Sequence, residues 1–352
     1  MTGGLAVAVL ILTSAALFFL PLVPAIRELY FSSDSQPLTV VQQHAGEIRY
    51  FAESFRNYIA TLRESLDKAT HTGSVIRGVL PDGVPYLVMG SDDCGLLERS
   101  SDGICQSLIA VGVDLVAPEK TSFLQDIYAA KNFVGGEHAA YRAILGEKNI
   151  ELGAASTVGR WIHAVGTFVA QKNCDLHGRI SSNHAIRLDR GCAFQRLNAP
   201  QIALGRVSSG CLIPAVATNQ VTEIVSRRFL YEGDYEIAAG ELMVGNLCVR
   251  GDLRVGSGAR VLGSVKSGAR LTVEPGAVIE GSLVSMLELH IGRGCVVHGP
   301  IIAERRLVIA SEARCGDLAR PTTVTAARIE VAEGTVVFGS LWARELGVVV
   351  AG

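Results

Sequence analysis

Five histidines are the side chains best suited to catalysis in the regular part of this chain, from residue 150 to residue 349. Histidine is a common general base because its neutral imidazole accepts a proton near neutral pH. A catalytic base also needs a cleft and polar partners that orient its ring, and the sequence shows no such grouping around any of the five. They are His163, His177, His184, His290 and His298. We therefore predict no catalytic residue.

The motifs of other enzymes and of cofactor sites are absent from the sequence as well. Its eight cysteines contain no C-x-x-C pair and no spacing to histidine typical of zinc, so we expect free thiols and no metal ion. No G-x-S-x-G, H-E-x-x-H, P-loop or dinucleotide fingerprint occurs, and we expect no cofactor. The Gly-x-Gly pairs in VGSGA and IGRGC recur periodically, which indicates corners of a repeat instead of a phosphate site.

The charge balance gives the protein no overall sign that would attract a polyanion. The chain has 32 basic and 34 acidic residues and a formal net charge of -2, so we expect no nucleic-acid partner. Arginines that cluster locally in the sequence are ordinarily solvated surface residues. The arginines in question are Arg227, Arg228, Arg305, Arg306, Arg314 and Arg320.

Apolar residues recur every six positions in the carboxy-terminal part of the chain. One uncharged row runs from Val255 to Cys315, and a second runs two residues earlier, from Leu253 to Ala313. Two rows that are two residues apart share one face of an extended strand. The first row is Val255, Val261, Ser267, Val273, Ile279, Ser285, Ile291, Val297, Ala303, Ile309 and Cys315. Its order of large, large and small side chains makes three successive steps of six the structural unit.

Three short strands in each 18-residue unit predict an all-β fold, a parallel β-helix whose coils stack on one another. Less regular copies of the same rows begin at Ile150. Cys174 and Cys192 are separated by one such unit, so we expect them to stack as thiols in neighbouring coils, about 4.8 Å apart. Glycines keep the same period where tight corners need a permissive backbone, at Gly245, Gly263, Gly281 and Gly299.

The order of the patterns along the chain predicts five parts. Leu5 to Val23 is an uncharged run with the length of a membrane span, although a cleaved signal peptide is an alternative. The predicted parts are a transmembrane helix at 1–26, a linker at 27–42, an amphipathic helix at 43–70, a small α/β capping region at 71–149, and the β-helix at 150–349 with an inserted loop at about 205–235. The amphipathic helix packs on its own domain or pairs with a second copy.

The apolar run also suggests an orientation. No Lys or Arg precedes it and Arg27 follows it, which favours a single-pass inner-membrane protein with its soluble domain on the cytoplasmic side. Cysteines without a disulfide framework agree with a reducing compartment.

The stretch LRVGSGARVLGSVKSGARLTVEPGAVIEGSL resembles the repeat of the bactofilins, the polymer-forming cytoskeletal proteins of bacteria. The resemblance covers about Glu236 to Leu346 well and Ile150 to Gln201 more loosely. It implies a right-handed β-helix, end-to-end self-association without nucleotide, membrane attachment, and scaffolding of envelope or polysaccharide enzymes. The long amino-terminal part departs from the short tails of typical members, and the inserted loop is a candidate docking site for partners.

Two other classes of β-helix remain as alternatives. Hexapeptide-repeat acyltransferases and nucleotidyltransferases also use 18-residue coils, in a left-handed β-helix, and the period does not reveal handedness. Lyase-like carbohydrate-binding helices usually display aromatic and acidic ladders, which a chain with 6% aromatic residues does not favour. A scaffold that associates through its coil ends fits best, because a coil end exposes unpaired backbone N–H and C=O groups.

Overall fold

The computed structural model describes residues 2–23, 49–206 and 227–352. It has two compact units, Met1–Ala45 and Gly46–Gly352. The first unit contains helix α1, Thr2–Phe19, followed by a 3-10 turn, η1, at Leu20–Leu22. None of the helices in the described ranges is long and apolar enough to cross a membrane, so the transmembrane helix predicted at 1–26 is not supported.

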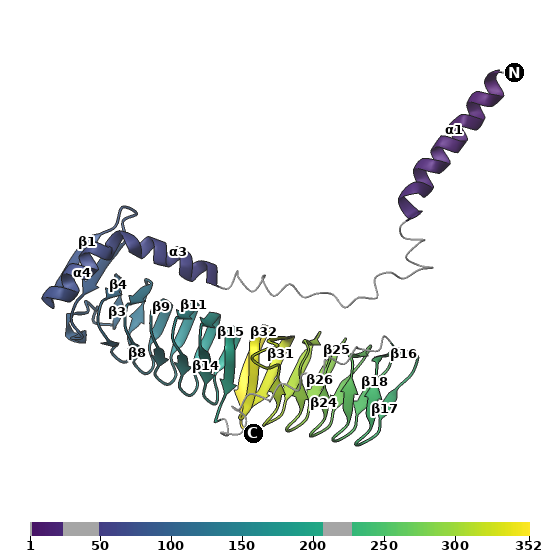
Figure 1. The fold of residues 1–352 in the computed structure, drawn as a ribbon. Coiled ribbons are helices and arrows are strands. Elements are labelled where there is room, and N and C mark those ends of the chain that lie inside the picture. The colour runs from purple at the N-terminus through teal and green to yellow at the C-terminus, as the bar shows by residue number, and fades with distance from the viewer. Residues whose placement is uncertain (1, 24–48, 207–226) are drawn as a thin grey trace. The chain divides into compact units, whose positions relative to one another are not determined.

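The second unit opens with an amphipathic helical segment. Helix α3, Tyr50–Ile59, continues through the 3-10 turn η3, Ala60–Leu62, into α4, Arg63–Thr72, which ends at Gly73 in a left-handed conformation. The buried side chains recur at intervals of three and four residues, at Ala52, Phe55, Ile59, Leu62, Leu66 and Ala69. They pack on the outside of the β-helix of the same chain (Figure 1). Residues 43–48 of the predicted helix lie outside the described residues.

The rest of the second unit is a parallel β-helix with a short hairpin at its start (Figure 1). Its first half contains β1 Val75–Val79, β2 Pro85–Met89, β3 Ile104–Cys105, β4 Leu108–Val111, β5 Leu115–Val116, β6 Ser122–Phe123, β7 Ile127–Ala129, β8 Phe133–Gly135, β9 Ala140–Gly146, β10 Ile150–Leu152, β11 Thr157–Ala164, β12 Phe168–Ala170, β13 Asp175–Ser182, β14 Ala185–Leu188 and β15 Ala193–Leu204. A 3-10 turn, η4, lies at Cys94–Leu96.

The second half of the β-helix follows after residue 227. Its strands are β16 Arg228–Tyr231, β17 Tyr235–Ile237, β18 Leu242–Val244, β19 Asn246–Val249, β20 Leu253–Val255, β21 Arg260–Leu262, β22 Val265–Ser267, β23 Leu271–Val273, β24 Val278–Ile279, β25 Leu283–Ser285, β26 Glu288–Ile291, β27 Val296–Val297, β28 Ile301–Ala303, β29 Arg306–Ile309, β30 Arg314–Cys315, β31 Thr322–Ala332 and β32 Thr335–Val350. We call these two parts the first half and the second half.

The predicted 18-residue coil is confirmed in the second half. Val255 pairs with Val273, and Val273 with Ile291, in successive parallel strands. The two apolar rows face inward and are almost fully buried. The small residues of the first row fit because the Ser267 and Ser285 hydroxyls each donate to a backbone carbonyl of the preceding coil, of Gly251 and Ala269. The coil after Ile301 is longer, since Arg306 pairs with Arg328.

The first half begins well before the predicted boundary at Ile150. Ile109 pairs with Ile127 in parallel, at the same 18-residue spacing, inside the region predicted as an α/β cap at 71–149. The six-residue count of the apolar rows does not extend into this region, because Phe133 pairs with Ile150, one position short of the 18-residue spacing. A β-bulge after Val158 restores the full spacing. A coil shortened by one residue moves every following side chain to another phase, which breaks a fixed count by six.

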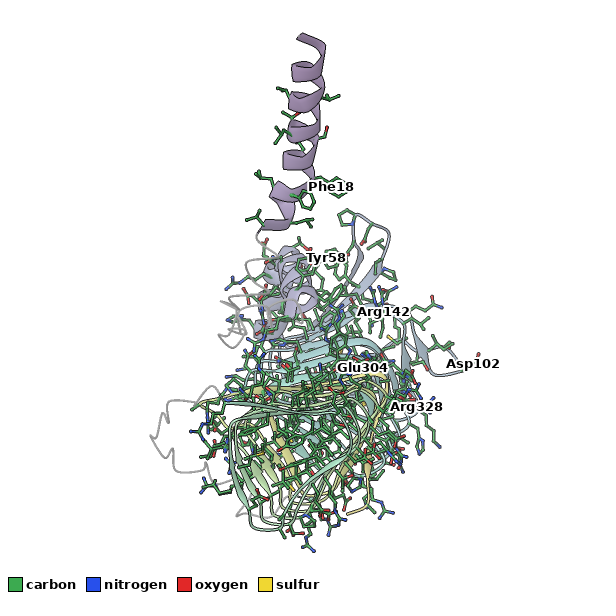
Figure 2. All side chains as sticks on the ribbon, turned by 90° about the vertical axis from the view of Figure 1, so that its right-hand side faces the viewer. Phe18, Tyr58, Asp102, Arg142, Glu304 and Arg328 are labelled. Carbon is green, nitrogen blue, oxygen red and sulfur yellow. The ribbon has the colours of Figure 1, made fainter. Side chains whose placement is uncertain are left out.

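The two halves meet at their last strands, an arrangement that we call the joint. β15 pairs with β32 in the antiparallel direction along three sides of the coil, with Ala193 opposite Val348, Asn198 opposite Ser340 and Ile202 opposite Val337. The second half therefore runs back toward the first, and the carboxy-terminal coil of each half faces the other (Figure 1). Glu304 and Arg328, both labelled in Figure 2, have exposed side chains that form ion pairs with Arg344 and Glu345.

Candidate functional site

The joint is an interface between two coil edges of the β-helix. Phe194, Leu197, Ile202, Val337 and Leu341 are all buried in it, so the apolar core continues from one half into the other. Outside the core, the Asn198 amide donates to the Ser340 hydroxyl at 2.9 Å. The ladders and the core both show that one coil edge of this chain can pair with another that runs in the opposite direction.

Gly347 makes the joint fit around a phenylalanine. It lies opposite Phe194 in the antiparallel register. A Cβ atom on residue 347 would collide with the ring of Phe194. The glycine thus makes room for a large core side chain at the contact between the two halves.

The amino-terminal end of the first half is covered in part. β1 pairs with β2 in the antiparallel direction and so occupies one side of this end. Beyond it, the buried Leu97 and the partly buried Cys94 and Leu96 pack against the end of the core. In the described residues β1, β3 and β5 each pair with one neighbour, so this end keeps unpaired strand edges beside the residues that cover its core.

The opposite end of the rod is different. We call residues 228–244, with β16, β17 and β18, the end coil. Each of these strands pairs with one neighbour, β19, β20 or β21, and in the described residues no strand occupies its other side. Tyr231 and Glu241 bond to the next coil through their carbonyls, and Tyr235 through its N–H. Because backbone direction alternates along a strand, the N–H and C=O groups of Leu230, Glu236 and Leu242 point to the open edge.

The end coil also exposes apolar and aromatic side chains. Leu230 and Leu242 are 61% and 59% exposed. Tyr231 and Tyr235 stack with their ring centroids 4.0 Å apart, and both are only partly buried at the end of the core. Hydrogen bonding to Tyr231, followed by burial, raises the pKa of Tyr235. An open backbone edge beside apolar side chains is the combination that favours addition of another strand.

The five histidines singled out in the sequence are dispersed over the molecule. His163 is buried, and its Nδ1 lies 2.8 Å from the Ser181 hydroxyl. Burial lowers the pKa of His163 to about 4, so its ring is neutral at physiological pH. His177, His184 and His290 are exposed on separate strands or corners.

His298 alone among the five belongs to a polar cluster. Its Nδ1 lies 3.3 Å from an Asp317 carboxylate oxygen and 3.0 Å from an Arg320 guanidinium nitrogen, and Glu280 lies 3.8 Å from its Nε2. Burial, then the charge of Arg320, lowers the pKa of His298. Asp317 also accepts hydrogen bonds from the backbone of Ala319 and Arg320, so the cluster fastens the corner of the lengthened coil.

Cys174 and Cys192 lie where the repeat predicts them, in neighbouring coils. Both are buried and free, and they precede Asp175 and Ala193, which pair in neighbouring coils. The Cys192 thiol donates to the Gln171 carbonyl at 3.0 Å. A hydrogen bond with Cys174, together with burial, raises the pKa of Cys192, which keeps this thiol protonated. Cys211 lies outside the described residues.

Ion pairs between coils occupy the outer surface of the second half. Arg306 pairs with Glu330 at 2.8 Å, and Arg320 with Glu280 at 3.6 Å. Arg314 stacks on the ring of Phe338 with its guanidinium carbon 5.0 Å from the centroid. The arginines singled out in the sequence therefore do not gather into one basic patch. Arg227 and Arg228 lie at the end coil instead.

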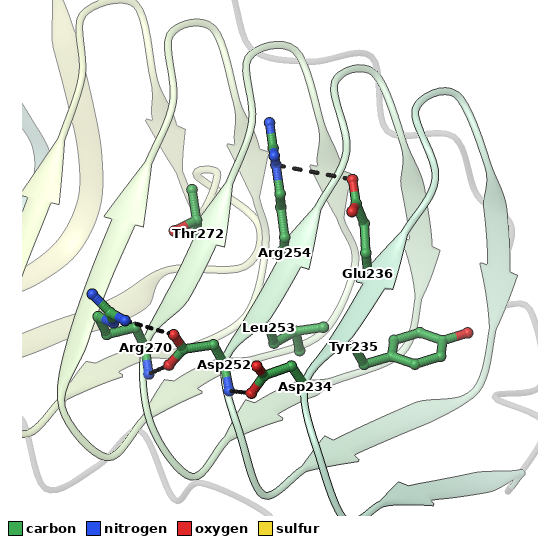
Figure 3. A pocket seen from close by; sticks show the side chains of 8 residues that line it. All are labelled: Asp234, Tyr235, Glu236, Asp252, Leu253, Arg254, Arg270 and Thr272. Carbon is green, nitrogen blue, oxygen red and sulfur yellow. Dashed lines mark hydrogen bonds and ion pairs between the residues drawn. The ribbon is translucent and has the colours of Figure 1, made fainter.

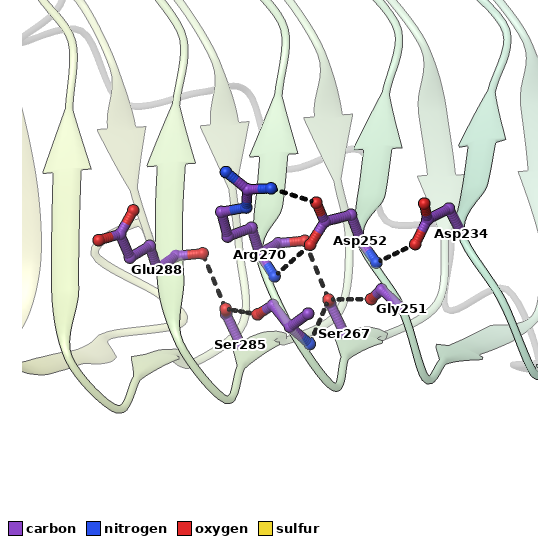
Figure 4. A network of polar contacts seen from close by, with 8 residues as sticks. Asp234, Gly251, Asp252, Ser267, Arg270, Ser285 and Glu288 are labelled. Carbon is purple, nitrogen blue, oxygen red and sulfur yellow. Dashed lines mark hydrogen bonds and ion pairs between the residues drawn. The ribbon is translucent and has the colours of Figure 1, made fainter.

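An open depression of about 450 Å³ lies on this charged surface (Figure 3). Asp252 connects its coils: its carboxylate accepts from the backbone N–H and the guanidinium of Arg270, at 3.0 and 2.8 Å. Asp234 accepts from the Asp252 N–H in the same way, and Figure 4 shows the resulting ladder. The charged groups of the depression form hydrogen bonds and ion pairs with one another across coils, so they connect neighbouring coils.

Comparison with known proteins finds no match to this chain among family models, curated proteins or solved structures. The resemblance to bactofilins stays a prediction.

Sequence reasoning missed the residues of the joint and of one outer face. Trp161 lies under α3, with its ring centroid 5.6 Å from that of Phe55. Trp342, in β32, is 40% exposed, and the Arg196 guanidinium lies 4.4 Å from its ring centroid. The available signal was the rarity of tryptophan, since the chain has only two. The Gly-x-Gly corners were predicted correctly: Gly258 and Gly294 have φ values of +65° and +66°.

Proposed function

We propose that the protein is a structural scaffold whose β-helical rods associate through the open edge of the end coil. The observation that carries the proposal is the joint, in which β15 and β32 pair in opposite directions along three sides of a coil. The end coil offers the same elements, namely a triangular edge of backbone groups and adjoining apolar side chains. Antiparallel pairing of an edge with its own copy is self-complementary and creates a two-fold axis.

The number of open ends determines the type of assembly. We infer that β1 and residues 94–97 hinder pairing at the amino-terminal end, and the two inner ends are used in the joint. A rod with one open end forms closed pairs, whereas an unlimited filament needs two open ends. Closed pairs are therefore the assembly that we propose, in place of the filaments that the resemblance to bactofilins implies.

The membrane and the partners belong to the same proposal. The uncharged run from Leu5 to Val23 attaches the scaffold to a bacterial inner membrane, with the rod on the cytoplasmic side. There it organises envelope or polysaccharide enzymes, as a bactofilin-like protein would. Membrane fractionation tests the attachment: the full chain should sediment with membranes and a chain lacking residues 2–23 should not. Equal distribution of the two chains would contradict membrane attachment and leave the pairing of rods intact.

Proline substitutions at the open edge test the association directly. Leu230→Pro with Leu242→Pro removes two outward N–H groups without removing a hydrogen bond between coils. We expect sedimentation velocity of the full chain in detergent to show pairs for the wild type and single rods for this variant. The matched control is Leu230→Ala with Leu242→Ala, which keeps both N–H groups.

Three results would decide against the proposal. A wild-type chain that stays single at high concentration contradicts it, and so does a proline variant that pairs as well as the alanine control. Long filaments would show that a second end is open. Equal thermal unfolding of the two variants establishes that the proline substitutions leave the rod folded. The depression around Asp252 has no histidine in its lining, so it gives no support to the acyltransferase alternative.

A further inference from the structure

One face of the rod continues from the first half into the second, but the helices cover it only in the first half. Across this face, Trp161 is in register with Arg179, Arg179 with Arg196, and Arg196 with Trp342. From there the register passes through Thr325, Ile302 and Val284 to the end coil. In Figure 1, α3 runs above β9 and β11.

The helical segment contacts this face one strand after another. Phe51 lies under the Arg179 guanidinium of β13, which is 4.9 Å from its ring centroid, and Phe55 meets Trp161 of β11. Arg56 pairs with Glu147 directly after β9 at 2.8 Å. At the far end, Ala69 lies close to Gly90, directly after β2.

The match between helix and coils has a simple geometric cause. A helical turn rises about 5.4 Å, and neighbouring coils are about 4.8 Å apart, so side chains one turn apart fall on successive strands. Residues 51–69 rise about 27 Å, close to the roughly 24 Å of five strand spacings from β13 to β2. Any helix with an apolar stripe that lies along the rod can use this correspondence.

The continuation of the face in the second half lacks such a cover in the described residues. We call it the bare strip and define it by one outward residue from each strand: Trp342, Thr325, Ile302, Val284, Lys266, Cys248 and Leu230. Most of these side chains are apolar. Trp342 and Leu230, at its two ends, are 40% and 61% exposed.

The charges beside the bare strip differ between its two sides. Lys266 lies in the middle of the strip, Arg196 at one end and Arg228 beside the other end. The row two positions later contains Glu304 and Glu232, which pair with Arg344 and Arg250. No carboxylate occurs among the residues of the strip or in the row two positions earlier. That row is Arg228, Asn246, Ser264, Ser282, Pro300, Thr323 and Ser340.

We propose that the bare strip is a docking surface for an amphipathic helix of another protein, about 20 residues long, with acidic residues along one side of its apolar stripe. Its length follows from the six strand spacings between Trp342 and Leu230, about 29 Å. The continuity with the face that α3 and α4 already cover supports a helix as the occupant. Lys266 and the adjoining row without carboxylates support acidic residues along that side of the helix. This inference does not rest on the pairing of rods.

A designed peptide pair tests the docking surface. The first peptide has the length of the proposed helix, with leucines at helical spacing and glutamates beside them, and the second has the same composition in scrambled order. Trp342 is the reporter: binding of the first peptide should shift its emission to shorter wavelength, and Trp342→Phe should abolish the shift. The scrambled peptide should produce none.

Matched substitutions locate the binding. Ile302→Asp should weaken binding of the first peptide about tenfold or more by calorimetry. The control is Val308→Asp, a half-buried outward residue of β29 that is not part of the strip, and it should bind like the wild type. Lys266→Glu changes an exposed position. It should weaken binding of the glutamate peptide and strengthen binding of a peptide with lysines in place of the glutamates. The pairing of rods should survive all three changes, since none lies in the end coil.

Several outcomes would overturn the proposal. Equal binding of both peptides, or equal loss with Ile302→Asp and Val308→Asp, would show nonspecific association. Binding of the strip to anionic lipid vesicles in preference to the peptide would assign it to a membrane surface. Protection of Trp342 from acrylamide before any peptide is added would show that the chain itself or a second copy already covers the strip.

Discussion

The two halves of the rod solve the same packing problem with different side chains. The first half has large aromatic side chains in its core, among them Phe133, Phe168 and Phe194, and helices over one of its faces. The second half has almost only aliphatic and small side chains inside, and ion pairs such as Arg254 with Glu274 between its coils. In the first half, where the coil length varies, aromatic side chains and the packed helices add to the stability. In the second half, which is more regular, hydrogen bonds and ion pairs between coils take that role.

The ladders at one corner show how close the two halves remain. In the first half, the Asp114 carboxylate accepts from the Asn132 N–H and amide. In the second half, the Asp252 carboxylate accepts from the Arg270 N–H and guanidinium. Both fasten the start of one coil to the next, so the polar corner keeps its form while its partner changes from an amide to a charge.

The largest effect is expected where the two halves depend on each other. Leu341→Asp places a carboxylate in the joint, where Leu341 is fully buried opposite Leu197. An unpaired buried charge costs about 4 kcal/mol, so the halves should separate and unfold in two steps. Differential scanning calorimetry measures this, with Ser340→Ala on the outer face as the control. A single transition at the wild-type temperature would show that the joint contributes little.

A pH effect of intermediate size should be confined to the first half. Burial holds the pKa of His163 at about 4, below the ordinary value of 6.5, so the unfolded chain binds a proton more readily than the folded one. Stability is complete above pH 6.5 and falls as the pH is lowered toward 4, by roughly 3 kcal/mol at most. Denaturant unfolding at several pH values should show this slope in the wild type and a smaller slope in His163→Asn. An unchanged slope in that variant would assign the effect to other groups.

A smaller effect should distinguish the corners of the second half. A Cβ atom on residue 281 would collide with the backbone carbonyl of Gly263, so Gly281→Ala should cost about 2 kcal/mol. Gly258 has open space around it and a φ of +65°, so Gly258→Ala should cost only about 1 kcal/mol, the strain of a left-handed residue. Chemical denaturation of the two variants gives the comparison. The reverse order would mean that the coils yield at Gly281.

The smallest effect is expected from the charged ladder. Hydrogen bonds from Arg270 lower the pKa of Asp252, so the pair stabilises the fold above the ordinary pKa of the carboxyl and ceases to do so as the pH falls. Asp252→Asn should lower stability slightly at low salt, and the difference should vanish at high salt because both side chains are exposed. A large loss that persists in high salt would contradict a purely electrostatic role.

The sequence predicts the second half well because each inward position repeats once per coil, apart from the longer coil after Ile301. In the first half it predicts the rows from Ile150 onward and fails only before that residue, because the shortened step from Phe133 to Ile150 shifts the phase until the bulge after Val158 restores it. The joint is beyond this kind of reasoning, because the inward residues of β15 and β32 are the same types as in any other coil. The open end of the rod follows only once the direction of the second half is known.

A designed disulfide across the joint tests most directly that two coil edges of one chain pair in opposite directions. Asn198 and Ser340 lie opposite each other on the outer face, with a hydrogen bond of 2.9 Å between their side chains. Asn198→Cys with Ser340→Cys should therefore form a disulfide within one chain under mild oxidation, seen by mass spectrometry of the digest. Asn198→Cys with Thr323→Cys, one strand further away, should not. A bond in the second variant but not in the first would contradict the register and the direction of the joint.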